Sequence, residues 1–272
     1  MQPPVQPPQP KPLPGVRHIL AVSSCKGGVG KSTVASNLAI SLARRDRAVG
    51  LMDADIHGPS MHLMMGVSDE PESRDGRILP RESHGLRFMS LGLIAGEDTP
   101  IIWRGPIVGR MIQQFIIDVH WGELDYLVID LPPGTGDAQL TLAQSLALSG
   151  AIVVTTPQTV ALEDAIRGGE MFLKVDVPLV GVVENMSYFQ CPDCEDRVGL
   201  FGDGGGDRLA SHFNIPLLGS LPIAQAIREG GDNGRPIVLD DPQTADAFTG
   251  IAEQVEATID DLADEGPEIT IE

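Results

Sequence analysis

Short runs of apolar residues recur along the chain and alternate with segments of helical spacing. The runs are continuously apolar and are bounded by Gly, Pro or Asp, which is typical of strands buried on both faces of a sheet. They predict strands at Ile19–Ser23, Ala48–Met52, Leu86–Leu91, Tyr126–Asp130, Ala151–Thr155, Val180–Glu184 and Leu217–Leu221. Apolar spacing between these runs predicts helices at 32–45, 108–119, 137–148, 161–174, 204–213 and 243–263.

This alternation predicts an α/β fold, a mostly parallel twisted β-sheet with helices on both faces. Parallel strands need right-handed crossovers, and the intervening helices supply them. A polar, Gly-rich region at 68–85 interrupts the alternation and is compatible with a hairpin into Leu86–Leu91. Ligands of such sheets bind beyond the carboxyl ends of the strands, so functional residues are expected there.

The length of 272 residues favours one large domain, which we place at 15–263. Seven prolines fall within residues 1–14, which we therefore interpret as a disordered, proline-rich leader. Residues 264–272 form an acidic tail. No apolar run approaches the ~20 residues of a membrane span, and the N-terminus lacks the pattern of a secretory signal.

The charge balance is strongly acidic, with 38 Asp and Glu against 19 Lys and Arg. A basic surface is needed to neutralise phosphates, so we expect neither nucleic acid nor an anionic membrane as a partner. Three cysteines, an odd number, make a disulfide scaffold implausible and favour the cytoplasm.

A glycine-rich loop follows the first predicted strand and opens the first predicted helix. It predicts a phosphate-binding P-loop, in which backbone N–H groups and the helix N-terminus surround the phosphates of a nucleotide. Lys31 is placed to bind phosphate, and the Ser32 hydroxyl to bind Mg²⁺. Cys25 stands where the usual pattern has Gly. The predicted nucleotide-binding residues are Ser24, Cys25, Lys26, Gly27, Gly28, Val29, Gly30, Lys31, Ser32 and Thr33.

Three carboxylates end predicted strands and are expected to complete this site. Asp53 and Asp55 follow the second strand, where both approach the phosphates as the strand passes into a loop. Asp130 ends an apolar strand in the manner of a Walker B segment and is expected to hold Mg²⁺ through water. The Pro-Pro-Gly-Thr-Gly loop at 132–136 is expected to sense the γ-phosphate.

Cys191 and Cys194 form a Cys-x-x-Cys pair whose chemistry the spacing leaves open. Two such thiolates can share a metal, form a redox disulfide or be structural. A closed tetrahedral sulfur site needs four ligands, and the third cysteine belongs to the P-loop. A metal at this pair therefore predicts two copies of the chain meeting on a two-fold axis. Four sulfur ligands suit either a [4Fe–4S] cluster or Zn²⁺.

The segment Lys-Gly-Gly-Val-Gly-Lys-Ser-Thr at 26–33 resembles the deviant Walker A motif of the MinD/ParA class of P-loop ATPases. By this resemblance Lys26 reaches the partner's nucleotide across a dimer, so Lys26, Lys31 and Asp55 are the expected catalytic residues. Asp55 would position the attacking water, and Asp53 would support it or the metal shell. Asn185 resembles the asparagine that reads adenine, and Pro222 the segment that flanks the base.

A closer resemblance, covering roughly residues 13–250, is to the Mrp/ApbC family of iron–sulfur cluster carrier ATPases. It is carried by Leu13-Pro-Gly-Val16, the P-loop, Asp53-Ala-Asp-Ile-His-Gly-Pro-Ser60, Trp103-Arg-Gly-Pro106, Trp121–Tyr126, Asp130–Asp137, Glu184-Asn-Met-Ser187, Cys191-Pro-Asp-Cys194 and Ile227–Ile237. The resemblance implies an ATP- and Mg²⁺-dependent homodimer that holds a [4Fe–4S] cluster between subunits and delivers it to apoproteins.

Two other functions remain as alternatives. A MinD/ParA-like positioning switch would carry a basic membrane helix or a basic DNA-binding face, and the C-terminal region has neither. A zinc-stapled targeting ATPase for apolar client helices would need a methionine-rich groove, for which the cluster Met61, Met64 and Met65 is small.

Overall fold

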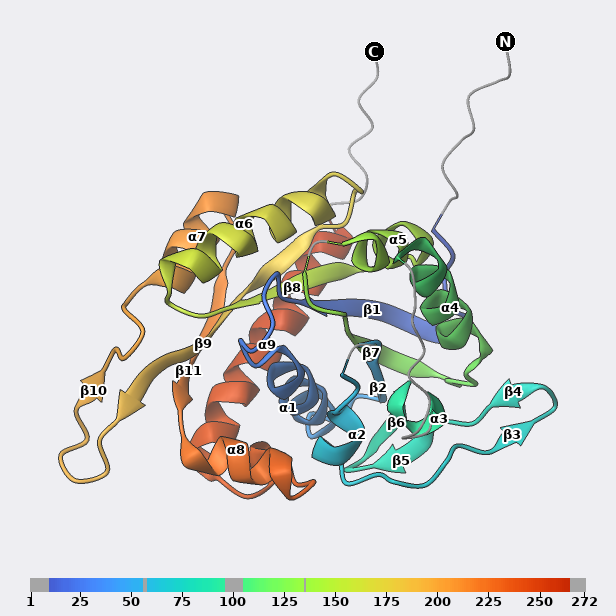
Figure 1. Ribbon diagram of the computed structural model, residues 1–272, viewed down its shortest axis with the longest axis horizontal. Helices are drawn as coiled ribbons and strands as arrows, with labels where there is room; N and C mark the ends of the chain where they lie inside the picture. Colours follow the sequence, from blue (N-terminus) through green and yellow to red (C-terminus); the bar gives the residue numbers. More distant parts are fainter. Residues whose placement is uncertain (1–9, 56–57, 96–104, 135, 265–272) are drawn as a thin grey trace, which may run out of the picture.

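The computed structural model describes residues 10–55, 58–95, 105–134 and 136–264. A mostly parallel sheet forms the centre of the molecule (Figure 1), with the strand order β10-β9-β8-β1-β7-β2-β6-β5, and β11 also pairs with β9. Within this sheet, β5 and β10 run antiparallel to their neighbours. The strands are β1 (Val16–Ser23), β2 (Val49–Asp53), β5 (Arg81–Ser83), β6 (Leu86–Ser90), β7 (Leu124–Asp130), β8 (Gly150–Thr155), β9 (Leu179–Gln190), β10 (Arg197–Val198) and β11 (Leu217–Ile223).

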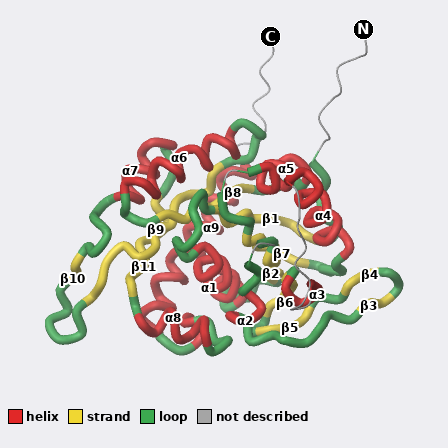
Figure 2. The backbone as a smooth tube through the Cα atoms, in the orientation of Figure 1, coloured by secondary structure: helices red, strands yellow, loops and turns green. Residues whose placement is uncertain are grey.

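Helices cover both faces of this sheet (Figure 2). One face packs against α1 (Lys31–Ala43) and α9 (Pro242–Asp264), with the short helices α2 (Met61–Met64) and α8 (Gln225–Asp232) and a 3-10 turn at Ile237–Leu239 beside them. The other face packs against α4 (Gly105–Asp118), α5 (Asp137–Ser145), α6 (Thr159–Leu173) and α7 (Gly205–Phe213). The short helix α3 (Gly92–Ala95) and the hairpin β3 (Ser73–Arg74) and β4 (Arg77–Ile78) complete the elements. The fold class predicted from the sequence is confirmed.

Alternation along β1 explains why the chain builds two cores. Successive side chains of a strand point to opposite faces. Leu20 and Val22 are therefore buried with α1 and α9, while Ile19 and Ala21 are buried with the helices of the other face. All four are at most 2% exposed, so the strand is apolar throughout. The result places the carboxyl end of β1, and the loop that follows it, between two fixed helical layers.

Part of the proline-rich leader lies against the domain. The Lys11 N–H donates to the Ser145 carbonyl at 2.9 Å, and the Ala147 N–H donates to the Lys11 carbonyl at 3.1 Å. The Leu13 side chain is 5% exposed and packs in the core beneath α4 and α5. The first nine residues of the leader and residues 265–272 of the acidic tail lie outside the described residues. No helix in the described ranges is both long and apolar enough to cross a bilayer.

Strand β9 is longer than the apolar run that predicted it. The run ends at Glu184, whereas β9 continues to Gln190 because β11 and then β10 pair with its second half. The pairing shifts where Ser220 faces Glu184 and Pro222 faces Tyr188, so β9 has two more residues than β11 in this stretch. Met186, within the resulting bulge, has the left-handed φ of 54°. Beyond it, β9 and β10 extend away from the sheet as a hairpin (Figure 1).

Candidate nucleotide site and cysteine hairpin

The P-loop joins the end of β1 to the start of α1. Gly28 and Gly30 both have φ of 82°, a left-handed conformation that glycine adopts without a Cβ clash. Gly30 caps α1, and no side chain satisfies the first N–H groups of that helix. Free N–H groups at a helix start attract anions, and α1 carries no acidic residue in its first turn to compete. The loop is thus suited to bind phosphate.

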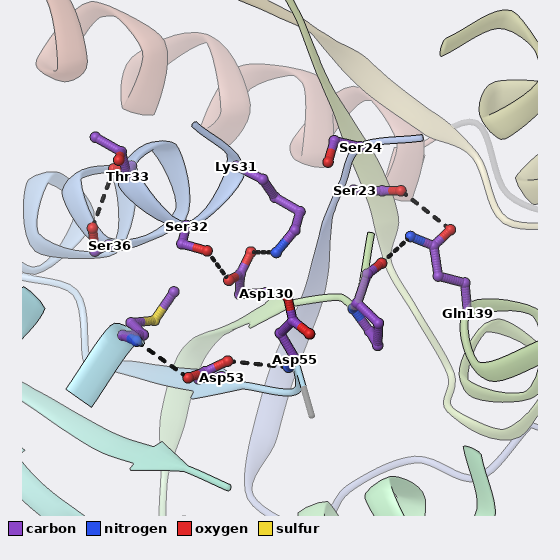
Figure 3. A network of polar contacts seen from close by, with 12 residues as sticks. Ser23, Ser24, Lys31, Ser32, Thr33, Ser36, Asp53, Asp55, Asp130 and Gln139 are labelled. Carbon is purple, nitrogen blue, oxygen red and sulfur yellow. Dashed lines mark hydrogen bonds and ion pairs between the residues drawn. The ribbon is translucent and has the colours of Figure 1, made fainter. Parts of the chain in front are cut away.

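Lys31 and Ser32 both converge on one buried carboxylate (Figure 3). The Lys31 ammonium pairs with Asp130 Oδ1, and the Ser32 hydroxyl donates to Asp130 Oδ2 at 2.6 Å. Lys31 is 6% exposed and Asp130 is fully buried. Burial raises the pKa of Asp130, while the charge and hydrogen bond of Lys31 oppose this effect. The structure therefore brings together the three residues that the sequence assigned to phosphate and Mg²⁺.

Asp53 lies beside this group, on the neighbouring strand. β7 lies between β1 and β2, and Asp130 faces Asp53 across the sheet. The Asp53 carboxylate accepts hydrogen bonds from the Ser90 hydroxyl at 2.8 Å and the Asp55 N–H at 3.1 Å. Burial, and next the charge of Asp130, raise the pKa of Asp53 to about 7. Asp53 therefore organises the loop that carries Asp55, whose own side chain is half-buried.

Gln139 is a site residue that the sequence did not reveal. Its side chain is buried at the start of α5, donates to the Pro132 carbonyl and accepts a hydrogen bond of 3.5 Å from the Ser23 hydroxyl (Figure 3). The Gly134 N–H also donates to the Ser24 carbonyl at 3.0 Å. These contacts hold the Pro-Pro-Gly segment against the P-loop. Thr135 of the predicted γ-phosphate sensor lies outside the described residues.

Lys26 and Cys25 differ from Lys31 in what they contact. Lys26 is exposed, and within the described ranges its ammonium contacts no carboxylate. Cys25 has a negative φ, so the conformation is open to any residue and does not require the usual Gly. The Cys25 thiol points away from the loop to α6, where a Cβ added at Gly168 would overlap its Sγ. Burial raises the pKa of this thiol to about 11.

Asn185 and Pro222 line the same cavity, at the far end of the P-loop. The Asn185 amide donates to the Val29 carbonyl at 2.8 Å, and a Cβ at Gly30 would overlap that amide. The cavity has a volume of about 920 Å³ and continues from Gly30 and Thr33 past these two residues. Its other walls were not predicted and come from β9, α2, α8 and the segment after β10; they include Met64, Met186, Leu200, Phe201, Ile227 and Arg228. Most of these walls are apolar, which suits a planar base.

Cys191 and Cys194 lie elsewhere, in the turn of the β9–β10 hairpin. The Cys191 N–H donates to the Asp196 carbonyl at 2.9 Å, and the Cys191 carbonyl accepts from the Glu195 N–H at 2.9 Å. The pKa of Cys191 is lowered because the N–H groups of Cys194 and Asp193 donate to its sulfur. Cys194 is exposed and Cys191 partly so. In the described ranges, no three His, Cys, Asp or Glu side chains gather as a metal site, so this pair supplies two ligands.

The comparisons with known proteins decide which P-loop family this is. Residues 15–256 match the family described as NUBPL iron-transfer P-loop NTPase. The chain belongs to this family. The family membership expected from the sequence motifs is thereby confirmed.

Relatives of this NUBPL-type chain are found in bacteria and eukaryotes. The "Iron-sulfur cluster carrier protein" of Synechocystis sp. is 51% identical over 262 residues, which cover 91% of this chain and 74% of that protein. The "Iron-sulfur cluster transfer protein NUBPL" of Mus musculus is 46% identical over 253 residues, with coverage of 91% and 79%. Both alignments span most of this NUBPL-type domain.

Two solved structures share the fold of this NUBPL-type NTPase. A nucleotide-binding protein from Archaeoglobus fulgidus, in complex with ADP, has a TM-score of 0.73 and 36% identity over 84% of this chain and 90% of that one. The cell division ATPase MinD of Pyrococcus furiosus has a TM-score of 0.64 and 25% identity over 88% and 98%. The predicted relation to the MinD/ParA fold is confirmed.

Proposed function

We propose that the chain is a Mg²⁺-dependent ATPase that holds a [4Fe–4S] cluster between two copies of itself and delivers it to apoproteins. The observation that supports this proposal most strongly is an accessible Cys-x-x-Cys pair on a hairpin of a P-loop NTPase. Relatives whose names describe iron–sulfur cluster carriage support the cargo. We place the protein in the cytoplasm, with neither nucleic acid nor membrane as a partner.

The nucleotide half of the proposal uses the P-loop network. When Mg·ATP binds, Ser32 and Asp130 would lie on the Mg²⁺ side of the phosphates. The Lys31 ammonium would leave Asp130 and bind a phosphate oxygen instead. Mg²⁺ supplies charge neutralisation at the phosphates. Asp55 would orient the attacking water, held in place by its N–H bond to Asp53. Lys26, exposed and without a carboxylate partner in the described ranges, would reach the nucleotide of the second copy.

The cargo half of the proposal uses the hairpin. Iron in a cluster of this kind binds thiolate sulfur, and the two N–H groups directed at Cys191 favour its thiolate. Two ligands from each copy complete four on a two-fold axis. The turn that carries the pair is mostly charged, but the large apolar side chain of Phe189, two residues before Cys191, is 37% exposed. An exposed aromatic side chain beside the pair would suit a contact between subunits or with a recipient.

Anaerobic reconstitution tests the cargo. The full chain is incubated with iron and sulfide, and absorption, metal content, sulfide content and mass in solution are measured. About four irons and four sulfides per dimer are expected. The variant Cys191→Ala/Cys194→Ala should load nothing, whereas Cys25→Ala should load normally. Stoichiometric zinc with no sulfide would favour the zinc-stapled ATPase, and a chain that binds neither would favour a MinD/ParA-like switch.

A separate measurement tests the use of ATP. Loaded wild type and Asp55→Asn are mixed with an apo-recipient in the presence of Mg·ATP, and cluster transfer is followed by absorption. Slower transfer is expected from the variant, because hydrolysis would lack its water-positioning carboxylate. Equal rates from both proteins would show that hydrolysis through Asp55 has no part in delivery.

A further inference from the structure

The two legs of the cysteine hairpin both touch the cavity beside the P-loop. On the outgoing leg, Asn185 and Met186 line the cavity, six and five residues before Cys191. On the returning leg, Leu200 and Phe201 line it, two and three residues after the end of β10. The cysteines are therefore held by a loop whose two ends meet at the nucleotide cavity.

Neither Leu200 nor Phe201 is buried by the protein itself. Leu200 is 57% and Phe201 40% exposed, although both are large apolar side chains lining a partly apolar hollow. The same hollow contains Gly30 and Thr33 of the P-loop region and the amide of Asn185. A planar apolar group extending from phosphates bound at the P-loop would cover these two side chains, and the base of a nucleotide has that shape.

The hairpin is also joined to the sheet at a point that can bend. The bulge around Met186 interrupts the pairing of β9 with β11, and Met186 holds a left-handed conformation that costs energy for a non-glycine residue. Next to it, the buried Glu184 carboxylate accepts from the Ser187 hydroxyl and from the Gly206 N–H, both at 2.5 Å. The bond from Gly206 fixes β9 to the start of α7 on the sheet side of the bulge, whereas the bond from Ser187 spans Met186 and links the two sides of the bulge.

We propose that Leu200 and Phe201 are positioning residues that form the base-side wall of the nucleotide cavity and transmit nucleotide binding to the Cys191–Cys194 hairpin. A bound nucleotide draws the returning leg towards Asn185, and the hairpin turns about the bulge at Met186. The thiols thus have a different accessibility with and without nucleotide. This inference rests on the proposed function in assigning a nucleotide to the cavity, but it requires no cluster.

The test uses the full, reduced, cluster-free chain and ADP with Mg²⁺ as the probe. Alkylation rates of Cys191 and Cys194 are measured by peptide-resolved mass spectrometry, which separates them from Cys25, with and without saturating ADP; calorimetry measures ADP affinity. In wild type ADP is expected to change the rates by about fivefold or more. In Leu200→Ala/Phe201→Ala, ADP should still bind through the P-loop but leave the rates nearly unchanged. The matched control Val198→Ala, on the same hairpin but outside the cavity, should behave as wild type.

The outcomes separate this inference from the proposed function. An undiminished ADP effect in the double variant would overturn it, as would wild-type rates that ADP does not change although it binds. Complete loss of ADP binding in the double variant would also contradict it, because the phosphates are held elsewhere. If ADP changes the alkylation rates of a chain that fails to load a cluster, the coupling between nucleotide and hairpin is supported and the proposed cluster cargo is rejected. A wild-type chain that binds no ADP would reject the nucleotide assignment of both.

Discussion

Asp53 and Asp130 face each other at the carboxyl ends of β2 and β7, so two buried carboxylates occupy one row of the sheet. Lys31 pairs with Asp130, and Asp53 instead depends on hydrogen bonds from Ser90 and two backbone N–H groups. Two neighbouring negative charges with one cation are costly in a low-dielectric interior. Asp53 therefore resists ionisation, and a second cation near the pair would favour its charged form.

The first prediction concerns stability and pH. The pKa of Asp53 is about 7 in the folded chain, above its ordinary value of 3.8, so the folded state holds a proton that the unfolded state has lost. Stability should therefore fall as pH rises from about 4 to 7. The variant Asp53→Asn has no such proton to lose. The difference between its free energy of unfolding and that of wild type should therefore rise with pH, by at most about 1.4 kcal/mol per pH unit.

Urea unfolding of the Mg²⁺-free, nucleotide-free proteins between pH 5 and 8 measures this difference. Asp55→Asn, which removes a half-buried carboxylate of the same loop, serves as the control. Parallel pH profiles for wild type and Asp53→Asn would contradict the assignment of the proton to Asp53.

The second prediction concerns the Lys31–Asp130 pair. Lys31→Met leaves a fully buried carboxylate without its cation, which should destabilise the nucleotide-free protein by about 3–5 kcal/mol. Asp130→Asn in the same chain removes the uncompensated charge and should restore part of that loss. A double-mutant cycle in urea measures the coupling, and additive effects would show that the pair contributes no interaction of its own.

The third prediction separates Lys26 from Lys31. Lys26 is exposed and contacts no carboxylate in the described ranges, so Lys26→Ala should change the free energy of unfolding by no more than about 0.5 kcal/mol. Its proposed role in the second copy predicts a loss of ATP hydrolysis of about a thousandfold with ATP binding retained. Lys174→Ala, at another exposed lysine, is the control. Full activity of Lys26→Ala would exclude the in-trans role.

The fourth prediction tests the contact between Cys25 and α6. An added methyl at Gly168 would overlap Cys25 Sγ, so Gly168→Ala should cost about 1–3 kcal/mol of overpacking, against a gain of about 1 kcal/mol in helix propensity. In a Cys25→Ala background the overlap is gone and the same substitution should stabilise. Thermal unfolding of wild type, Gly168→Ala, Cys25→Ala and the double variant measures the effect of Gly168→Ala in both backgrounds. The same sign in both backgrounds would disprove the contact.

Much of the fold could be predicted because its strands are buried on both faces. Runs such as Ala151–Thr155 are apolar at every position, and such runs have few alternative structures. The P-loop could be predicted because its glycines have a conformational requirement that sequence displays directly. Short local signals therefore sufficed to predict the candidate phosphate, Mg²⁺ and cysteine residues.

The remaining features depend on contacts between distant segments. The continuous apolar run stops at Glu184, and the polar residues Asn185 and Ser187 follow it, so β9 continues there because β11 and β10 supply partners. Helix α8 is only eight residues long, contains two glycines and has no fully buried residue, so its sequence shows little helical apolar spacing. Gln139 joins the site through a carbonyl contact to Pro132, which no spacing encodes.

The bulge in β9 has a consequence for how the protein opens. Residues of β9 up to Glu184 lie between β8 and β11 in the buried sheet, whereas those after the bulge pair with the last residues of β11 and with the two-residue strand β10. Amide hydrogens before the bulge should exchange with solvent only when the whole domain unfolds, and those after it through local opening. One strand thus contains both a global and a local exchange regime, and the cysteines can move at little cost to the stability of the P-loop NTPase core.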